Sequence, residues 1–282
     1  MSRLPIQLRL IAVFGAIILC CEAQTALETA KTIDKQILSL HDLTDDMRPA
    51  AIKTLSSRIR AQPVKYAVPL ATNLAIDGSE GSGFSALQVI ADTLTETLQK
   101  LPPNKTDQAD GFEMLAELMR YERVYTSLRD RRLDAAVNKI DIVDRKRRSA
   151  DFTLTDLDGK IWSLRRLRGH VVLISFWATW CPPCRRELPE LKAIYDHFHS
   201  RGLVILAISD EESATLRHFR SRNPISYPLL LDPGDKARKQ FVVRGIPQTF
   251  VYNREGSLIA EPIARPTLKG FRDILARAGI QN

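Results

Sequence analysis

Apolar residues in the first half of the chain recur at helical spacing. Two such series are Leu27, Ala30, Ile33, Ile37 and Leu40, and Phe84, Leu87, Ile90, Leu94, Leu98 and Leu101. Steps of three or four residues place these side chains on one face of a helix. Several prolines and the glycine- and serine-rich segment 77–83 interrupt the pattern. We therefore expect five or six antiparallel helices between residues 24 and 143, with the apolar faces forming a core.

After residue 150 the pattern changes to short apolar runs separated by helical segments. Residues 171–176 and 203–208 are continuous apolar runs, which predict buried strands. Asp158-Gly159 and residues 253–256 are turn signals, and both predict hairpins. Strands that alternate with helices and end in a hairpin and a helix favour a mixed sheet covered by helices. The chain thus reads as an all-α N-terminal domain followed by an α/β C-terminal domain with a central mixed β-sheet.

Two further segments divide the chain. Residues 144–149 form a run of charge, which we interpret as an exposed basic linker between the domains. At the N-terminus, two arginines precede the apolar run 10–21, and Ala23 follows it. Twelve apolar residues are short for a membrane span but suit a secretory signal. We predict that residues 1–23 are a signal peptide cleaved after Ala23, and that the protein is exported and faces the periplasm or cell envelope; an uncleaved membrane anchor is the alternative.

The composition, the net charge and the number of cysteines exclude several classes of function. The chain has 282 residues, of which 44% are hydrophobic and 26% charged, as in globular proteins. Its net charge of +8 is scattered, and no aromatic-plus-basic module is present, so we expect no nucleic-acid partner. Two of the four cysteines, Cys20 and Cys21, lie in the predicted signal, which leaves Cys181 and Cys184. One cysteine pair supports neither a disulfide-stapled scaffold nor a four-ligand zinc site, so we expect no metal.

Cys181 and Cys184 lie where a buried strand passes into the first turn of a helix. Backbone N–H groups left unpaired by that turn, together with the helix dipole, favour a thiolate at Cys181. Cys184 falls one turn further in, where we expect it to be more buried. This predicts that Cys181 attacks a partner disulfide and that Cys184 resolves the mixed disulfide, with no cofactor beyond the redox-active pair. A purely structural disulfide is the alternative, but so small a loop restrains the unfolded chain little.

The segment Trp177-Ala-Thr-Trp-Cys-Pro-Pro-Cys184 resembles the active site of the thioredoxin superfamily, and most closely the TlpA/ResA branch of exported thiol-disulfide oxidoreductases. The resemblance covers residues 150–282 and implies a thioredoxin-like fold there, whereas the helical domain is not covered. It implies that Pro247 follows a cis peptide bond and faces the disulfide. It also implies that the backbone of Ile246 pairs with a substrate peptide and that Trp180 contacts partners.

The same resemblance bears on proton transfer. Ser175 stands where small thioredoxins have a buried aspartate, so that proton acceptor is absent. Glu187 matches a glutamate that can take the proton of the second cysteine in the ResA-like branch. The alternative role of Glu187 is a first-turn acid favoured by the helix dipole.

The cysteine pair and the predicted signal indicate an exported thiol-disulfide oxidoreductase. The resemblance implies that it reduces disulfides in partner proteins and receives electrons from a membrane thiol donor. Cytochrome c maturation is one role known in the resembled branch. A peroxiredoxin-like thiol peroxidase is a second hypothesis, although Ala178 stands where such enzymes carry threonine. A third is a binding or scaffold protein whose helical domain carries the function, and that domain can also dock substrates for the redox domain. Contact with a membrane is expected only if the N-terminal segment stays uncleaved.

Overall fold

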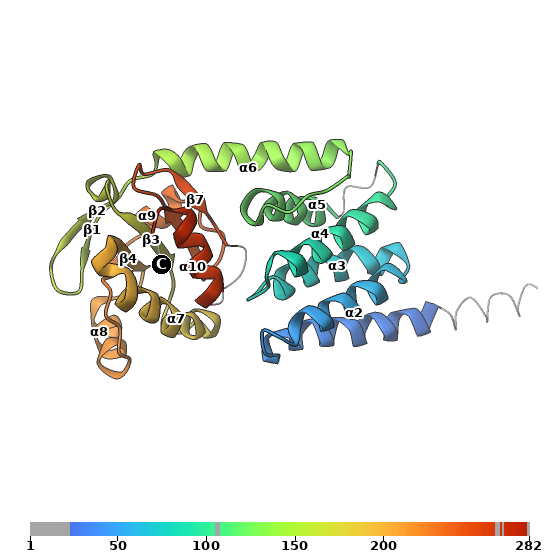
Figure 1. The fold of residues 1–282 in the computed structure, drawn as a ribbon, viewed down its shortest axis with the longest axis horizontal. Helices are drawn as coiled ribbons and strands as arrows, with labels where there is room; N and C mark the ends of the chain where they lie inside the picture. Colours follow the sequence, from blue (N-terminus) through green and yellow to red (C-terminus); the bar gives the residue numbers. More distant parts are fainter. Residues whose placement is uncertain (1–22, 105–107, 263–265, 267, 281–282) are drawn as a thin grey trace, which may run out of the picture.

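The computed structural model describes residues 23–104, 108–262, 266 and 268–280. The predicted signal, with Cys20 and Cys21, lies outside them except for Ala23. Figure 1 shows a helical half and an α/β half side by side, with the long helix α6 (Arg131–Ser149) reaching across both. Among the described residues, no helix has the length and apolar character needed to cross a membrane.

The helical half confirms the predicted helical array. Its elements are the helical segment 23–38, η1 (Ser39–Asp42), α2 (Arg48–Arg60), α3 (Val64–Gly78), α4 (Phe84–Gln99), α5 (Ala109–Glu117), the π-turn η2 (Leu118–Glu122) and α6. The apolar faces meet in one core, where completely buried residues include Ile33, Ile37, Ile52, Leu74, Ile90, Leu94 and Leu115. Asp130 caps α6 by accepting a hydrogen bond from the backbone N–H of Arg132 at 2.8 Å, which fixes where this helix begins.

The prediction of an exposed linker at residues 144–149 was wrong in two respects, although the other four residues of this run are exposed. These residues are the last turns of α6, and Asp144 and Arg147 are only 2% and 1% exposed. Asp144 accepts hydrogen bonds of 2.8 Å from the Tyr121 hydroxyl and from Arg120 Nε, so its charge is paired inside the protein. A charge run is usually solvated because unpaired charges are costly to bury. Here the hydrogen-bond partners of Asp144 come from another segment of the chain. The sequence of the charged run alone does not indicate that such partners exist.

The α/β half contains a seven-stranded mixed sheet within the described residues, in the order β2-β1-β5-β4-β3-β6-β7. Its strands are β1 (Thr153–Asp156), β2 (Ile161–Ser163), β3 (Val171–Phe176), β4 (Leu203–Ser209), β5 (Leu229–Leu231), β6 (Gln248–Tyr252) and β7 (Leu258–Ala260). Its helices are η3 (Leu164–Leu167), α7 (Pro182–Phe198), η4 (His199–Arg201), α8 (Ser213–Arg222), α9 (Lys236–Gln240) and α10 (Leu268–Arg277). Both predicted hairpins are present, and this half has the expected thioredoxin-like architecture.

Strand β3 is buried on both sides of the sheet. Val171 and Leu173 face a core built with α7, α8 and α10, whereas Val172 and Ile174 face a second core that includes residues of α9. This explains why its sequence is a continuous apolar run instead of an alternating one. Strand β6 pairs antiparallel with β3, with Gln248 opposite Phe176. The loop before β6 therefore lies at the same end of the sheet as the start of α7.

Candidate active site

Cys181 and Cys184 form a disulfide at the start of α7, with their Cα atoms 5.3 Å apart. Cys181 is the N-cap residue, and the backbone N–H of Cys184 points at its Sγ at 3.3 Å. Pro182 and Pro183 have no N–H, so Cys184 supplies the first backbone donor of the helix. In the reduced protein this donor and the helix dipole both favour a thiolate at Cys181.

Both cysteines are nearly enclosed by protein. Cys181 is 3% exposed and Cys184 is 1% exposed, so the predicted difference in burial is small. The neighbouring Trp180 is 70% exposed, whereas Trp177 is buried with its ring centroid 5.3 Å from that of Phe219. Trp180 thus presents an aromatic surface beside the disulfide, while Trp177 serves the core.

The loop before β6 faces the disulfide. The Ile246–Pro247 peptide bond is cis, the conformation that the resemblance implies. The carbonyl oxygen of Ile246 lies 3.8 Å from Cys181 Sγ. The structure therefore brings Ile246 and Pro247 to the nucleophile predicted from sequence, across 65 residues of chain.

Glu187 lies beneath the disulfide. It is 2% exposed, and it is three residues after Cys184 on α7, so both side chains occupy one buried face of the helix. The Thr249 hydroxyl donates a hydrogen bond to Glu187 Oε1 at 3.4 Å. Burial and the negative charge of Glu187 both raise the pKa of Tyr227. The proton-transfer role expected of Glu187 stays a prediction.

The helical half also reaches this site. A hollow of about 210 Å³ is lined by Glu187, Pro247 and Thr249 on one side and by Ile76, Asp77 and Glu80 on the other. Burial is the main cause that raises the pKa of Asp77, with His41 acting in the opposite direction. In the sequence, a local indication of this contact is the apolar residue Ile76, which lies beside the segment 77–83. In the structure the Ile76 side chain is 46% exposed.

A network of charged and polar side chains, buried at Arg147 and Glu261 and partly exposed at Arg244, ties the helical half to the loop that carries Pro247. Arg147 of α6 forms an ion pair with Glu261, which also accepts a hydrogen bond from Gln248 Nε2. Gln248 Oε1 in turn accepts a hydrogen bond of 3.1 Å from the backbone N–H of Arg244. The Arg244 side chain forms an ion pair with Glu117 of α5. Two helices of the first half are thus bonded to the two ends of this loop.

Comparisons with known proteins agree with this geometry. A family model described as the AhpC/TSA family matches residues 146–260. The thiol-disulfide oxidoreductase ResA of Halalkalibacterium halodurans is 33% identical over 112 residues, covering 39% of this chain and 64% of that protein. ResA of Bacillus thuringiensis strain Al Hakam is 30% identical over 125 residues, covering 43% of this chain and 72% of that protein. The chain belongs to the ResA-like thiol-disulfide oxidoreductases.

This membership confirms the resemblance and the enzyme class inferred from the Cys-Pro-Pro-Cys segment. The chain spans slightly less than two thirds of the H. halodurans ResA. Among solved structures, a DsbE-like protein of Chlorobium tepidum aligns with 25% identity and a TM-score of 0.43, covering 46% of this chain and 94% of its own. StoA of Bacillus subtilis aligns with 25% identity and a TM-score of 0.41, covering 45% of this chain and 96% of the StoA chain. The match to the AhpC/TSA family model begins near the end of α6, so most of the helical half lies outside it.

No group of three or more histidine, cysteine or acidic side chains that could hold a metal ion occurs in the part of the chain that the structure describes.

Proposed function

We propose that this protein is an exported reductase of disulfides in partner proteins and that Cys181 and Cys184 carry the reaction. The observation that supports this most directly is the Cys184 N–H, which lies 3.3 Å from Cys181 Sγ at the start of α7. The Ile246 carbonyl and the exposed Trp180 lie beside the same sulfur. An extended partner segment bound along Ile246 would present its disulfide to Cys181.

The reaction begins with the reduced protein. The Cys181 thiolate attacks one sulfur of the partner disulfide; the partner S–S bond breaks, and the second partner sulfur leaves as a thiolate with the electron pair. Cys184 then gives its proton to the Glu187 carboxylate and attacks Cys181 Sγ. The mixed disulfide breaks, the partner leaves with two reduced sulfurs, and the Cys181–Cys184 disulfide forms. Two electrons have moved to the partner.

Regeneration requires a dithiol donor, because each cycle leaves the cysteine pair oxidised. We propose that a membrane thiol protein reduces the pair by the same steps in reverse. Export by residues 1–23 would place the enzyme in an oxidising compartment, where partner cysteines become disulfide-bonded. The cysteine pair of an apocytochrome before haem attachment is one substrate class consistent with this chemistry.

A trapping experiment tests the proposal. In Cys184→Ser, Cys181 can still attack a partner but nothing resolves the mixed disulfide. We expect exported partner proteins to accumulate in adducts with Cys181 that dithiothreitol releases. The Cys181→Ser/Cys184→Ser double variant is the control and should form none. Absence of adducts from a folded, exported Cys184→Ser protein would overturn the proposal.

The helical half would assist by forming one wall of the substrate site, since Ile76, Asp77 and Glu80 line the same hollow as Glu187 and Pro247. In that case Ile76→Ala should raise KM for a protein disulfide while leaving reduction of a small disulfide unchanged. Ile142→Ala is a matched control, because Ile142 is similarly exposed, at 49%, on α6. If the full chain still captured partner proteins after both cysteines were replaced, that result would instead favour the scaffold hypothesis.

Peroxidase activity is the alternative within the enzyme class, because the matching family model is described as AhpC/TSA. Ala178, which is completely buried, offers no hydroxyl near Cys181 to orient a peroxide. We expect the reduced protein to consume hydrogen peroxide no faster than the Cys181→Ser variant. Rapid consumption that depends on Cys181 would favour the peroxidase.

A further inference from the structure

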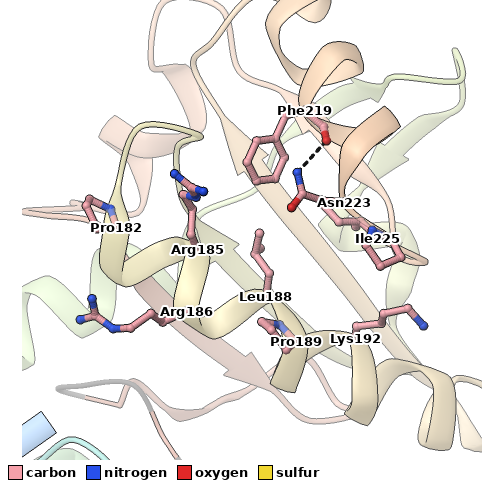
Figure 2. A pocket seen from close by; sticks show the side chains of 10 residues that line it. Pro182, Arg185, Arg186, Leu188, Pro189, Lys192, Phe219, Asn223 and Ile225 are labelled. Atoms are coloured by element: carbon pink, nitrogen blue, oxygen red, sulfur yellow. Dashed lines mark hydrogen bonds between the residues drawn. The ribbon is translucent and has the colours of Figure 1, made fainter. Parts of the chain in front are cut away.

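A groove of about 500 Å³ runs along α7 on the side that faces α8 (Figure 2). Its lining comes from α7 and from the C-terminal part of α8 with the turn after it. The lining residues are Pro182, Arg185, Arg186, Leu188, Pro189, Lys192, Phe219, Asn223, Pro224 and Ile225. This groove lies on a different set of residues from the hollow that contains Glu187 and Pro247, although Arg186 borders both.

The groove is apolar at its base and is held in shape by the surrounding structure. In Figure 2, Leu188 points into its centre, with Phe219 on the opposite wall. Phe219 packs against the buried Trp177, and the Asn223 amide donates a hydrogen bond of 2.9 Å to the Phe219 carbonyl, which fixes the turn after α8. A preformed apolar groove binds a partner without the cost of ordering its own wall.

The charged residues that line the groove are all cations. They are Arg185, Arg186 and Lys192, and no carboxylate is among the described residues that line it. Arg185 makes no ion pair within the described part of the chain and lies between Pro182 and Phe219 in Figure 2, whereas Arg186 points away from the groove. Lys192 lies at the other end of the groove and forms an ion pair with Asp196, one turn further along α7. The groove is thus a non-polar channel with the Arg185 cation at one end and the Lys192–Asp196 ion pair at the other.

We infer that this groove binds an acidic, apolar segment of the partner protein, adjacent in sequence to the disulfide that is reduced. The inference rests on the proposed disulfide exchange. The groove begins at Pro182, which follows Cys181 directly, so a segment bound here continues from the attacked sulfur. From Pro182 to Lys192 the helix rises about 15 Å, which an extended segment covers with about five residues. An apolar side chain would occupy the space over Leu188, and carboxylates would meet Arg185 and Lys192.

Disulfide-bonded model peptides test the inference on the full-length reduced protein. One peptide carries Asp-Leu-Glu within five residues of its disulfide, and the matched peptide carries Asn-Leu-Gln at the same positions. We expect kcat/KM to be about tenfold higher for the acidic peptide at low ionic strength, which corresponds to about 1.4 kcal/mol. The preference should shrink in 0.5 M salt, because the charges at the groove ends are partly exposed.

The variant Arg185→Glu/Lys192→Glu should bring the ratio of the two kcat/KM values to about one or below. Taking a ratio removes any effect of these substitutions on the sulfur chemistry. The control Arg166→Glu/Lys236→Glu makes the same change of net charge at exposed residues that do not line the groove, and it should keep the preference. An equal loss in both double variants, or no preference in the wild type, would overturn the inference. Reduction of the small substrate hydroxyethyl disulfide distinguishes failure of this inference from failure of the proposed function. If the wild type reduces hydroxyethyl disulfide but does not prefer the acidic peptide, the protein is an oxidoreductase without this docking site.

Discussion

Arg147 and Glu261 form a buried ion pair that joins the last helix of the helical half to the segment after the final strand. Their side chains are 1% and 5% exposed. Arg147 Nε also donates a hydrogen bond of 2.9 Å to the Phe241 carbonyl, and its guanidinium lies 4.9 Å from the centre of the Phe250 ring. The contact between the two halves is therefore specific, and it reaches the strand that follows the Pro247 loop.

Replacement of Arg147 should destabilise the folded protein. In Arg147→Met, the Glu261 carboxylate stays buried without its cation, so we expect the free energy of unfolding to fall by about 3–5 kcal/mol at pH 8. Urea unfolding measures this. Arg165→Met is the control, because Arg165 pairs with Asp151 while its side chain is 77% exposed, and its loss should cost no more than about 1 kcal/mol. Similar costs in both variants would show that the buried pair does not hold the halves together.

Glu261 should make stability depend on pH. Burial raises its pKa from 4.5 to about 7, although Arg147 opposes the shift. The folded state therefore binds this proton more tightly than the unfolded state does. The resulting stabilisation is complete below about pH 4.5 and is lost as the pH rises to about 7, and it amounts to about 3 kcal/mol at most.

Glu261→Gln should remove this part of the pH dependence, because glutamine does not titrate. The measurement is urea unfolding of the wild type and the variant from pH 4.5 to pH 8. Glu255→Gln, at an exposed position in the β6–β7 turn, should follow the wild-type profile. Parallel profiles for the wild type and Glu261→Gln would contradict the shift.

The reduced cysteines should differ in reactivity. Cys181 Sγ receives the Cys184 N–H, which favours its thiolate, whereas the Cys184 side chain lies on the inner face of α7. We expect iodoacetamide at pH 7 to alkylate Cys181 at least about tenfold faster than Cys184, measured by peptide mass spectrometry. The same protein unfolded in urea serves as the control and should show nearly equal rates. Equal rates in the folded protein would remove the basis for assigning Cys181 as the nucleophile.

Glu187→Gln should slow release of the partner without slowing its capture. Glutamine cannot accept the Cys184 proton, so resolution of the mixed disulfide should slow by about 100-fold near pH 7. The effect should diminish at higher pH, where Cys184 ionises without help. Quenched-flow measurement of the mixed disulfide tests this, with the exposed Glu212→Gln as control. Unchanged resolution would leave Glu187 with only a structural role.

Local sequence patterns predicted much of this molecule. The runs 171–176 and 203–208 became the central strands β3 and β4, and both predicted hairpins formed. The position of Cys181 at a helix start also followed from the buried strand before it. These features depend on hydrogen bonding and side-chain periodicity over a few neighbouring residues, which a sequence displays directly.

Only the tertiary structure decided how distant segments meet. Arg147 and Glu261 are 114 residues apart, and the charge run around Arg147 indicated a solvated linker instead of a buried contact. The wall formed by Ile76 and Asp77 beside Glu187 depends on how the two halves pack. The sequence by itself determined most of the elements and identified the redox pair. The tertiary structure decided the partners of the buried charges and the walls of the site, because whether a polar group is buried or solvated depends on the surfaces that close over it.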